Sequence, residues 1–326
     1  MKTNYIENIK TLQEHETAQD FFMIKLAEIK LTKAGKEYLD FVLCDKTGEI
    51  NGKKWDMEDE DKKLIKQVKV GDLVKVRGSI NIWGMEKQLR ITKWRKAIPN
   101  DNLKQEDYIR AAPENSEKMF RFIFSKAEEI EDSDLRMLST EILKRNKDKL
   151  IYYPAATRNH HALYGGLLYH MKRMLMAGEA LCQVYENLDR SLVSAGVILH
   201  DMEKLREIEA NEMGLAEKYT FEGNMLGHLV LGVRELEKDM TELGFDEEKK
   251  IMVEHMILAH HYEPEFGSPK RPMFPEAELL HYLDVLDARM YDMEEVLKDV
   301  PSGEFSDKVW ILHNRMLYKR KEGGSD

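Results

Sequence analysis

The chain has 326 residues, enough for two domains that each bury a core of their own. Its two cysteines, Cys44 and Cys182, lie far apart and outside any Cys-x-x-Cys spacing, which excludes a disulfide framework and a zinc ribbon and favours a reducing compartment. The N-terminus carries charges where a signal peptide needs an apolar segment, and no apolar run is long enough to cross a bilayer, so we expect a soluble cytoplasmic protein without a membrane partner.

The net charge of −10 is unevenly distributed. Residues 1–99 contain 20 Lys or Arg and 16 Asp or Glu, whereas the remainder contains 30 and 44. Residues 62–96 contain 11 basic side chains against two acidic ones. A local basic surface matters more for phosphate binding than the total charge does, but such a run can also be a merely solvated face, and the charge alone leaves both interpretations open.

Residues 18–97 show the alternating apolar pattern and the turn residues of short strands. The pattern predicts one helix at 58–68 and five strands, at 21–31, 38–44, 49–55, 73–78 and 88–92. Five short strands with one helix in roughly eighty residues is the layout of an OB-fold barrel.

Residues 98–115 are polar and contain prolines, which indicates a linker. Beyond them the apolar periodicity is helical throughout. The predicted helices cover 116–130, 133–146, 163–187, 191–209, 224–243, 247–260, 276–298 and 307–320, and the first two open on Ser116 and Ser133 as caps. We therefore expect a multidomain chain, with an all-β OB-fold barrel in residues 1–99, a linker in 100–115 and an all-α helical bundle in 116–326.

The first domain resembles nucleic-acid-binding OB domains in the hairpin at 43–50 and in the segment 70–78. Such barrels bind single strands by stacking bases on exposed aromatic rings beside cations that meet the phosphates. The candidates are the aromatic and basic side chains Tyr38, Trp55, Trp83, Arg77, Lys87 and Arg90. Phe41 is expected to pack inside the barrel, whereas Trp55 and Trp83 adjoin charged or glycine-rich turns and are expected to be exposed.

An adjacent pair, His200 and Asp201, ends an apolar helical segment, and His170 and Asp284 lie on strongly periodic segments before and after it. A His-Asp dipeptide alone occurs by chance in many proteins. Four such residues on three periodic segments are rarely accidental, and imidazole with carboxylate suits a hydrolytic divalent metal better than a structural zinc.

This pattern resembles the HD superfamily of metal-dependent phosphohydrolases, whose ligands are a His, the His-Asp pair and a late Asp. The order of the two domains is similar to that of the bacterial YhaM family of 3′–5′ exoribonucleases over nearly the whole chain, including 160–162, 165–168, 227–228 and 268–289. The resemblance implies metal ligation by His170, His200, Asp201 and Asp284, with His228, His260 and His261 as candidates for a second ion. It implies Mn²⁺, although the ligands alone also allow Mg²⁺, Fe²⁺ or Co²⁺, as one or two ions per site.

Two residues are expected to take part in catalysis. Asp201 has two oxygens with which to bridge two ions, and Lys204, one turn later, could bind a phosphate oxygen or assist the leaving group, or else pair with Glu203 or Glu207 on the helix surface. Further contacts to the substrate backbone are expected from Arg158, His160, His161, Lys270 and Arg271. His281 and Asp287, one turn either side of Asp284, are expected to orient ligands rather than to bind metal.

The resemblance thus implies a metal-dependent exonuclease that degrades single-stranded RNA from its 3′ end, with single-stranded DNA as a secondary substrate. Two alternatives stay open: an HD phosphohydrolase of a small nucleotide or cyclic dinucleotide, and a non-catalytic factor that binds single-stranded nucleic acid. A small-nucleotide enzyme has no need of an OB platform, and the complete ligand set argues against the non-catalytic factor. The sequence is also compatible with a homo-oligomer.

Overall fold

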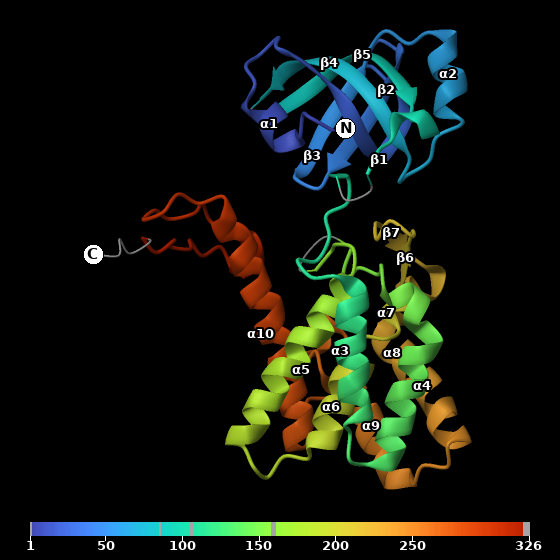
Figure 1. Cartoon of the computed structure of the whole chain (residues 1–326), viewed down its shortest axis with the longest axis vertical. Coiled ribbons are helices and arrows are strands. Elements are labelled where there is room, and N and C mark those ends of the chain that lie inside the picture. Colours follow the sequence, from blue (N-terminus) through green and yellow to red (C-terminus); the bar gives the residue numbers. More distant parts are fainter. Residues whose placement is uncertain (1, 85, 105–106, 158–160, 322–326) are drawn as a thin grey trace. The chain divides into compact units, whose positions relative to one another are not determined.

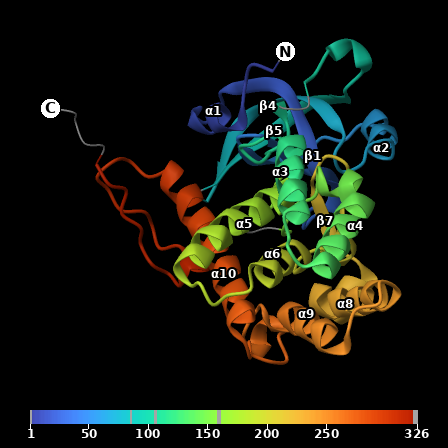
Figure 2. The same cartoon turned by 60° about the horizontal axis from the view of Figure 1, so that its bottom comes forward.

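A computed structural model describes the chain except for residues 1, 85, 105–106, 158–160 and 322–326. The chain divides into two compact units, Met1–Ala111 and Ala112–Asp326, a β barrel and a helical unit (Figures 1 and 2). Arg158 and His160, both expected to contact substrate, fall outside the described residues. In the part of the chain that is described, none of the helices combines the length and apolarity needed to cross a bilayer.

The first unit contains the predicted OB-fold barrel. Its elements are a helix α1 (Ile6–Thr11), strands β1 (Thr17–Leu31), β2 (Glu37–Asp45) and β3 (Gly48–Lys54), a helix α2 (Asp59–Ile65), and strands β4 (Leu73–Trp83) and β5 (Glu86–Lys96). The strands close in the order β1-β2-β3-β5-β4, because β1 is long enough to pair with β4 through its first half and with β2 through its second. A 3-10 turn at Pro99–Asp101 follows the barrel.

The barrel interior is filled by alternate apolar side chains of the strands, as period-two patterning requires. Phe41 is completely buried there, as predicted, and stacks edge-on with Trp94 at a centroid distance of 5.1 Å. The short helix α1 was not predicted, because six residues carry too little periodicity; its Ile6 and Ile9 join the same core.

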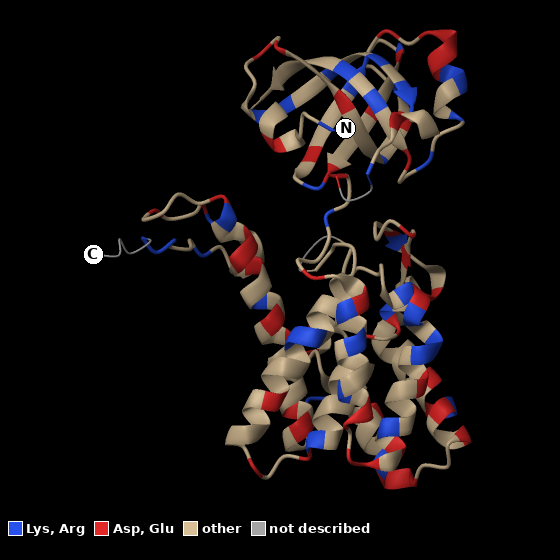
Figure 3. Cartoon of the chain, viewed as in Figure 1, with Lys and Arg blue, Asp and Glu red and all other residues tan. Residues whose placement is uncertain are grey.

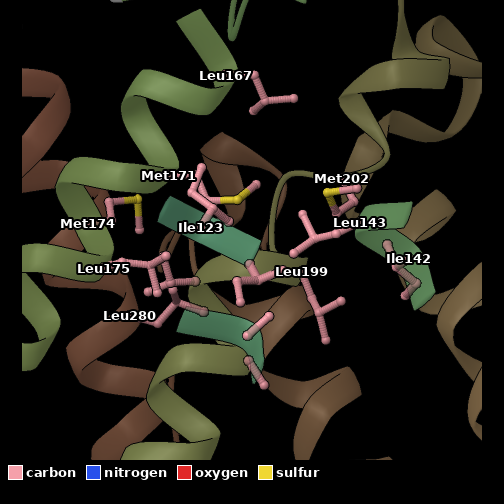
Figure 4. Packing of buried hydrophobic residues seen from close by; sticks show 14 of the residues in the cluster. Ile123, Ile142, Leu143, Leu167, Met171, Met174, Leu175, Leu199, Met202 and Leu280 are labelled. Carbon is pink, nitrogen blue, oxygen red and sulfur yellow. The ribbon is translucent and has the colours of Figure 1, made fainter. Parts of the chain in front are cut away.

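The second unit is largely helical. Its helices are α3 (Ser116–Glu128), α4 (Ser133–Leu150), α5 (Gly166–Val184), α6 (Arg190–Leu199), α7 (Lys204–Glu207), α8 (Phe221–Glu242), α9 (Glu247–Ala259) and α10 (Pro275–Lys298), with 3-10 turns at Pro264–Phe266 and Trp310–Leu312. Their apolar faces share one core, in which Met171 and Met174 of α5 pack near Leu199 and Leu280 (Figure 4). The core fixes the helices from which the candidate ligands project.

Three expectations about this unit are wrong. The helix predicted at 191–209 ends at Leu199 and is followed by a turn, α7 and a hairpin of β6 (Ile208–Ala210) and β7 (Ala216–Tyr219). The segment 307–320 is an extended hairpin with bridges Phe305–Tyr318 and Val309–Arg315, and His313 and Asn314 have positive φ, which a helix cannot accommodate. The caps of α3 and α4 are Asn115 and Asp132, one residue before the predicted serines.

Candidate metal centre

All seven predicted metal ligands meet inside the helical unit. They come from five helices: His170 from α5, His200 and Asp201 from the end of α6, His228 from α8, His260 and His261 from the end of α9, and Asp284 from α10. His170, His200, Asp201 and His260 are almost completely buried. The packing of the helices therefore brings together candidate ligands that are spread over 115 positions of the sequence.

Asp201 stands between two groups of histidines. Its Oδ2 lies 3.2 Å from Nε2 of His200 and 3.8 Å from Nε2 of His170. Its Oδ1 lies 3.4 Å from Nε2 of His228 and 4.0 Å from Nε2 of His260. The ligand atoms of His228, His260 and His261 lie within 4.8 Å of one another, as do those of His170, His200 and Asp201.

Each histidine is held by the nitrogen that faces away from this centre. Nδ1 of His200 donates to the carbonyl of Val197 at 2.9 Å, and Nδ1 of His260 donates to that of Ile257 at 2.8 Å. A carbonyl can only accept, so Nδ1 carries the proton and, in the neutral ring, the lone pair of Nε2 points to the centre. His261 is fixed in the same way, because its Nδ1 donates to the carbonyl of Phe266 at 2.8 Å.

The buried atoms at the centre fit a divalent cation. Among the described residues no hydrogen bond reaches Nε2 of His200, His228 or His260, or Oδ1 of Asp201. Polar atoms buried without a partner are costly, and here they surround a common point. Nitrogen and carboxylate ligands of this kind suit Mn²⁺, Fe²⁺, Co²⁺ or Zn²⁺.

The local charges favour ionised carboxylates. Burial raises the pKa of Asp201, but the neighbouring His200 and Lys204 outweigh burial and hold it well below the usual range. Burial alone would lower the pKa of His170; its hydrogen bonds to Asp284 and Asp287 raise it to about 9. Burial and the adjacent His261 and His200 lower the pKa of His260 well below its ordinary value, which keeps that ring neutral.

Lys204 points into the centre rather than along the helix surface. Its Nζ lies 2.7 Å from Oδ2 of Asp201, and its side chain is mostly buried. The alternative partners Glu203 and Glu207 are not its ion-pair partners among the described residues. A cation held beside the carboxylate is placed to meet a phosphate oxygen.

Asp287 holds the ring of the candidate ligand His170. Its Oδ2 accepts from Nδ1 of His170 and from Nε2 of His161, both at 2.7 Å, while Oδ1 accepts from Nε of Arg173 at 2.5 Å. His161, expected to contact substrate, is completely buried, and its bond to Asp287 makes it a supporting residue instead. His281 has a similar position, since its Nδ1 donates to the carbonyl of His260 at 2.7 Å.

A kink in α8 brings in His228. Gly227 has φ 70° and ψ 161°, a conformation that strongly favours glycine, and it breaks the helix at this point. The freed backbone N–H of His228 and its Nδ1 both bond to Oε1 of Glu207 at 3.0 Å. Those bonds outweigh burial and lower the pKa of Glu207, so the carboxylate is ionised where it holds the ring.

The loop after α9 contacts the candidate ligand His261. The backbone N–H of His261 donates to Oγ of the buried Ser268 at 3.1 Å, in addition to the bond between His261 and Phe266. Lys270 is exposed on this loop, whereas Arg271 is engaged with both oxygens of Glu263 at 3.0 Å. Of these two predicted substrate contacts, Arg271 would have to leave its ion pair.

Comparison with known proteins shows the family to which the chain belongs. The model of the HD domain matches residues 167–289, and that of the OB-fold nucleic acid binding domain matches residues 24–97. A Bacillus licheniformis protein named 3′-5′ exoribonuclease YhaM is 36% identical over 315 residues, covering 95% of this chain and 98% of that protein. This chain belongs to the YhaM family. Proteins of the same name from Geobacillus and Bacillus subtilis are 37% and 36% identical to this chain. Each comparison covers 93% of this chain, and 92% and 95% of those proteins.

The barrel of this YhaM-family chain carries an aromatic and basic surface. Trp83 at the β4–β5 turn is 79% exposed, as predicted. Trp55, also expected to be exposed, is half-buried because its ring contacts that of the half-buried Tyr38 at a centroid distance of 4.6 Å. Lys53 lies 5.2 Å from the Tyr38 ring and is paired across the sheet with the exposed Arg90. Figure 3 marks Lys and Arg positions in blue at several places along the strands of the barrel.

Two of the predicted barrel contacts differ in their surroundings. Arg77 is exposed on β4, where it is paired across the sheet with Lys93 on β5. Nζ of Lys87 donates to the carbonyls of Lys10 and Leu12, both at 2.8 Å, so this side chain fastens α1 to the barrel. The basic run is also partly neutralised, because Lys62 pairs with Glu37 and Lys96 with Asp72.

Sequence reasoning missed Glu207, which holds the candidate ligand His228, and Arg173, which bonds to Asp287, the partner of His170. Each is an ordinary charged residue on a helix, and no local pattern distinguishes it. Only the Gly227-His228 dipeptide signals that the N–H of His228 needs an acceptor, and nothing nearby in the sequence says that Glu207, 21 positions earlier, supplies it.

Proposed function

We propose that this chain is a divalent-metal-dependent exonuclease that degrades single-stranded RNA from the 3′ end. The observation that carries the proposal is the set of buried nitrogen and oxygen atoms without hydrogen bonds around Asp201. The barrel with its aromatic and basic surface supports a polymeric substrate, and the similarity to proteins named 3′-5′ exoribonuclease supports the polarity and the preference for RNA.

A divalent cation bound here would polarise the phosphate and lower the pKa of a bound water to generate the nucleophile. The chain's part is to hold the ligands. Asp201 presents one oxygen to His170 and His200 and the other to His228 and His260, so these five residues would hold the one or two ions of the centre. Asp287 and Glu207 fix His170 and His228 through the opposite nitrogens.

Lys204 is proposed as the residue that binds a nonbridging phosphate oxygen. Burial opposes its charge, but Asp201 and Asp284 outweigh burial and raise the pKa of the ammonium, so it stays protonated at neutral pH. It can therefore neutralise charge that develops on phosphate during hydrolysis. Lys270 and Arg271 on the neighbouring loop are proposed to contact the sugar-phosphate backbone.

Mn²⁺ is the proposed ion, and single-stranded DNA is proposed as a secondary substrate, since the stacking surface of an OB barrel does not depend on the 2′-hydroxyl. A cytoplasmic location also stays a proposal. It rests on the unpaired, buried Cys44 and Cys182, and cell fractionation would check it.

The deciding experiment compares hydrolysis of single-stranded RNA and DNA, labelled at the 5′ or the 3′ end, with Mn²⁺, Mg²⁺ or EDTA. A 3′–5′ exonuclease releases the 3′ label at once as a mononucleotide and shortens the 5′-labelled strand stepwise, with no product in EDTA. Hydrolysis of a cyclic dinucleotide without trimming of RNA would favour the small-nucleotide enzyme. Binding without cleavage under every metal would favour the non-catalytic factor.

A further inference from the structure

The C-terminal hairpin, residues 301–321, is an arm that follows the end of α10 and projects from the helical unit (Figures 1 and 2). Its 3-10 turn at Trp310–Leu312 contacts α10, and Leu312 is completely buried. The arm is ordered by its own backbone: the N–H of Ser306 donates to the carbonyl of Leu317 at 2.8 Å, and that of Val309 to Arg315 at 2.9 Å. Arg289, in the middle of α10, bonds to His313 at 3.0 Å and fastens the arm to that helix. The arm is thus a built structure rather than a loose tail.

The arm exposes apolar side chains and positive charge. Trp310 is 77% exposed, Phe305 63% and Met316 56%. Residues 301–321 contain five Lys or Arg and two Asp or Glu, a net charge of +3. The exposed Lys308 and Arg320 have no ion pair with any described residue. Large apolar side chains grouped on a projecting segment indicate a surface that another protein covers.

A groove lined by apolar and acidic side chains lies near the start of α10. It has a volume of about 680 Å³, large enough for a bulky side chain such as an indole, and lies between the α5–α6 connection and the start of α10. Val184, Tyr185 and Tyr282 line it and are 69%, 59% and 56% exposed. Its charged lining residues are Glu186 and Glu278, neither of which has an ion pair among the described residues.

The arm of one chain does not line the groove of the same chain. It is held along the C-terminal half of α10, because Arg289 bonds to His313 and Nζ of Lys319 donates to the carbonyl of Lys298. The groove lies about two helical turns before Arg289, at Tyr282, and none of the described residues of the arm lines it. The groove of each chain is therefore open to the arm of a second copy.

We propose that the basic, aromatic arm of one chain docks in the acidic, apolar groove of a second copy of this chain. Trp310 and Met316 enter the groove, and Lys308 and Arg320 pair with Glu186 and Glu278 of the next chain. Because arm and groove are different surfaces, the contact is head-to-tail, and every chain receives one arm and donates one. Such contacts close into a ring when their rotation allows it, and otherwise continue as a filament.

Two variants separate the surfaces. The arm variant combines Trp310→Ser with Lys308→Glu, and the groove variant combines Tyr282→Ser with Glu278→Lys. Ile251→Ser, which removes a 55% exposed apolar side chain of α9 outside both surfaces, is the matched control. Circular dichroism and the thermal midpoint establish that each variant is folded, and size exclusion with light scattering gives the mass.

The wild type and the Ile251→Ser control are expected to be oligomers, and each double variant a monomer of 38.2 kDa. An equimolar mixture of the two variants is expected to form a heterodimer of twice that mass and nothing larger, since only one intact arm and one intact groove remain. A symmetric contact between two arms could not produce this result.

Several results would overturn the proposal. These are a monomeric wild type, an arm or groove variant that keeps the wild-type mass, a control that dissociates as well, or a mixture that stays monomeric. An arm variant of unchanged mass that has lost affinity for RNA would show that the arm binds nucleic acid instead.

Discussion

In each candidate histidine ligand, the nitrogen that faces the centre is determined by the bond that the opposite nitrogen makes. His200, His260 and His261 donate Nδ1–H to carbonyls of their own helix or loop, whereas His170 and His228 bond to the carboxylates of Asp287 and Glu207. Helix ends supply the carbonyls without cost in sequence, because the last carbonyls of a helix have no intrahelical donor. The carboxylates must come from elsewhere in the chain.

Replacing Asp201 should abolish activity. It is the residue whose two oxygens face both groups of histidines, so Asp201→Ala would remove the carboxylate that the two groups share. We expect hydrolysis of RNA to fall by more than about 100-fold, since losing a residue that only orients a ligand already costs 10–100-fold. Asp299→Ala, an exposed carboxylate at the end of α10, is the control. A folded Asp201→Ala protein within tenfold of wild type would contradict the assignment.

Replacing Asp287 should weaken metal binding without removing a ligand. Asp287→Asn keeps the shape of the side chain but loses the charge that holds His170, so Mn²⁺ affinity measured by calorimetry should fall about 10–100-fold. Glu294→Gln removes the other ion pair of Arg173, at 3.2 Å, and leaves His170 untouched. Equal effects of the two substitutions would mean that Asp287 acts only through Arg173.

At the scale of elements, two glycines decide how helices enter the centre. Gly227 kinks α8 so that His228 turns inward, and Gly166 lets the start of α5 approach the carbonyl of His161, which a Cβ would meet at 1.9 Å. The second contact is with backbone, which cannot rotate away.

Gly166→Ala should therefore destabilise the helical unit. Overpacking of this kind typically costs about 1–3 kcal/mol in the free energy of unfolding. Gly178→Ala on the same helix meets only the side-chain methyls of Leu283 and Val193, both at 3.3 Å, and should cost less. Urea unfolding of both variants gives the comparison. If Gly166→Ala is the milder substitution, the approach of α5 to His161 is not constrained.

The strands of the barrel make a separate prediction about binding. In an Asp201→Ala background, Trp83→Ala should weaken binding of single-stranded RNA by about 1–3 kcal/mol, the usual contribution of one stacked base. Trp55→Ala should have a similar effect, and affinity should fall as salt rises because phosphate contacts release counterions. Leu31→Ala, which shortens a 67% exposed apolar side chain of β1, is the control for stacking. If the RNA affinity measured by fluorescence anisotropy changes neither with the two tryptophan substitutions nor with salt, this surface is only a solvated face.

At the scale of the whole molecule, charge and chemistry are divided between the two units. Residues 1–99 have the basic excess, and every candidate ligand lies in the acidic remainder. We therefore expect the barrel to bind the RNA strand and the helical unit to hydrolyse it.

The fragment 112–326 should keep Mn²⁺-dependent hydrolysis of a small phosphodiester such as bis-p-nitrophenyl phosphate. Its affinity for long single strands should fall by at least tenfold, because the stacking surface is gone. Matched measurements on the full chain supply the reference for both rates. Equal trimming of a long RNA by fragment and full chain would exclude a substrate role for the barrel.

The sequence alone predicted the five strands of the barrel, most helices of the second unit and the set of candidate ligands. Strand and helix periods are local properties of the backbone, and the His-Asp pair with its flanking His170 and Asp284 is a local pattern on each helix. The same rule explains the error at 307–320. The apolar residues at 309–312 have a spacing that a helix also allows, whereas the bridge from Phe305 to Tyr318 depends on a return of the chain that no local period encodes.

Only the tertiary structure decided which side chains support the ligands and which surfaces are left uncovered. Asp287 reaches His161 across 126 positions, and Glu207 reaches His228 across 21, through packing of helices whose faces carry no mark of the partner. The same holds for the arm and the groove, which belong to the two ends of α10. Bonds between distant segments depend on how the cores pack, and packing is a property of the whole chain.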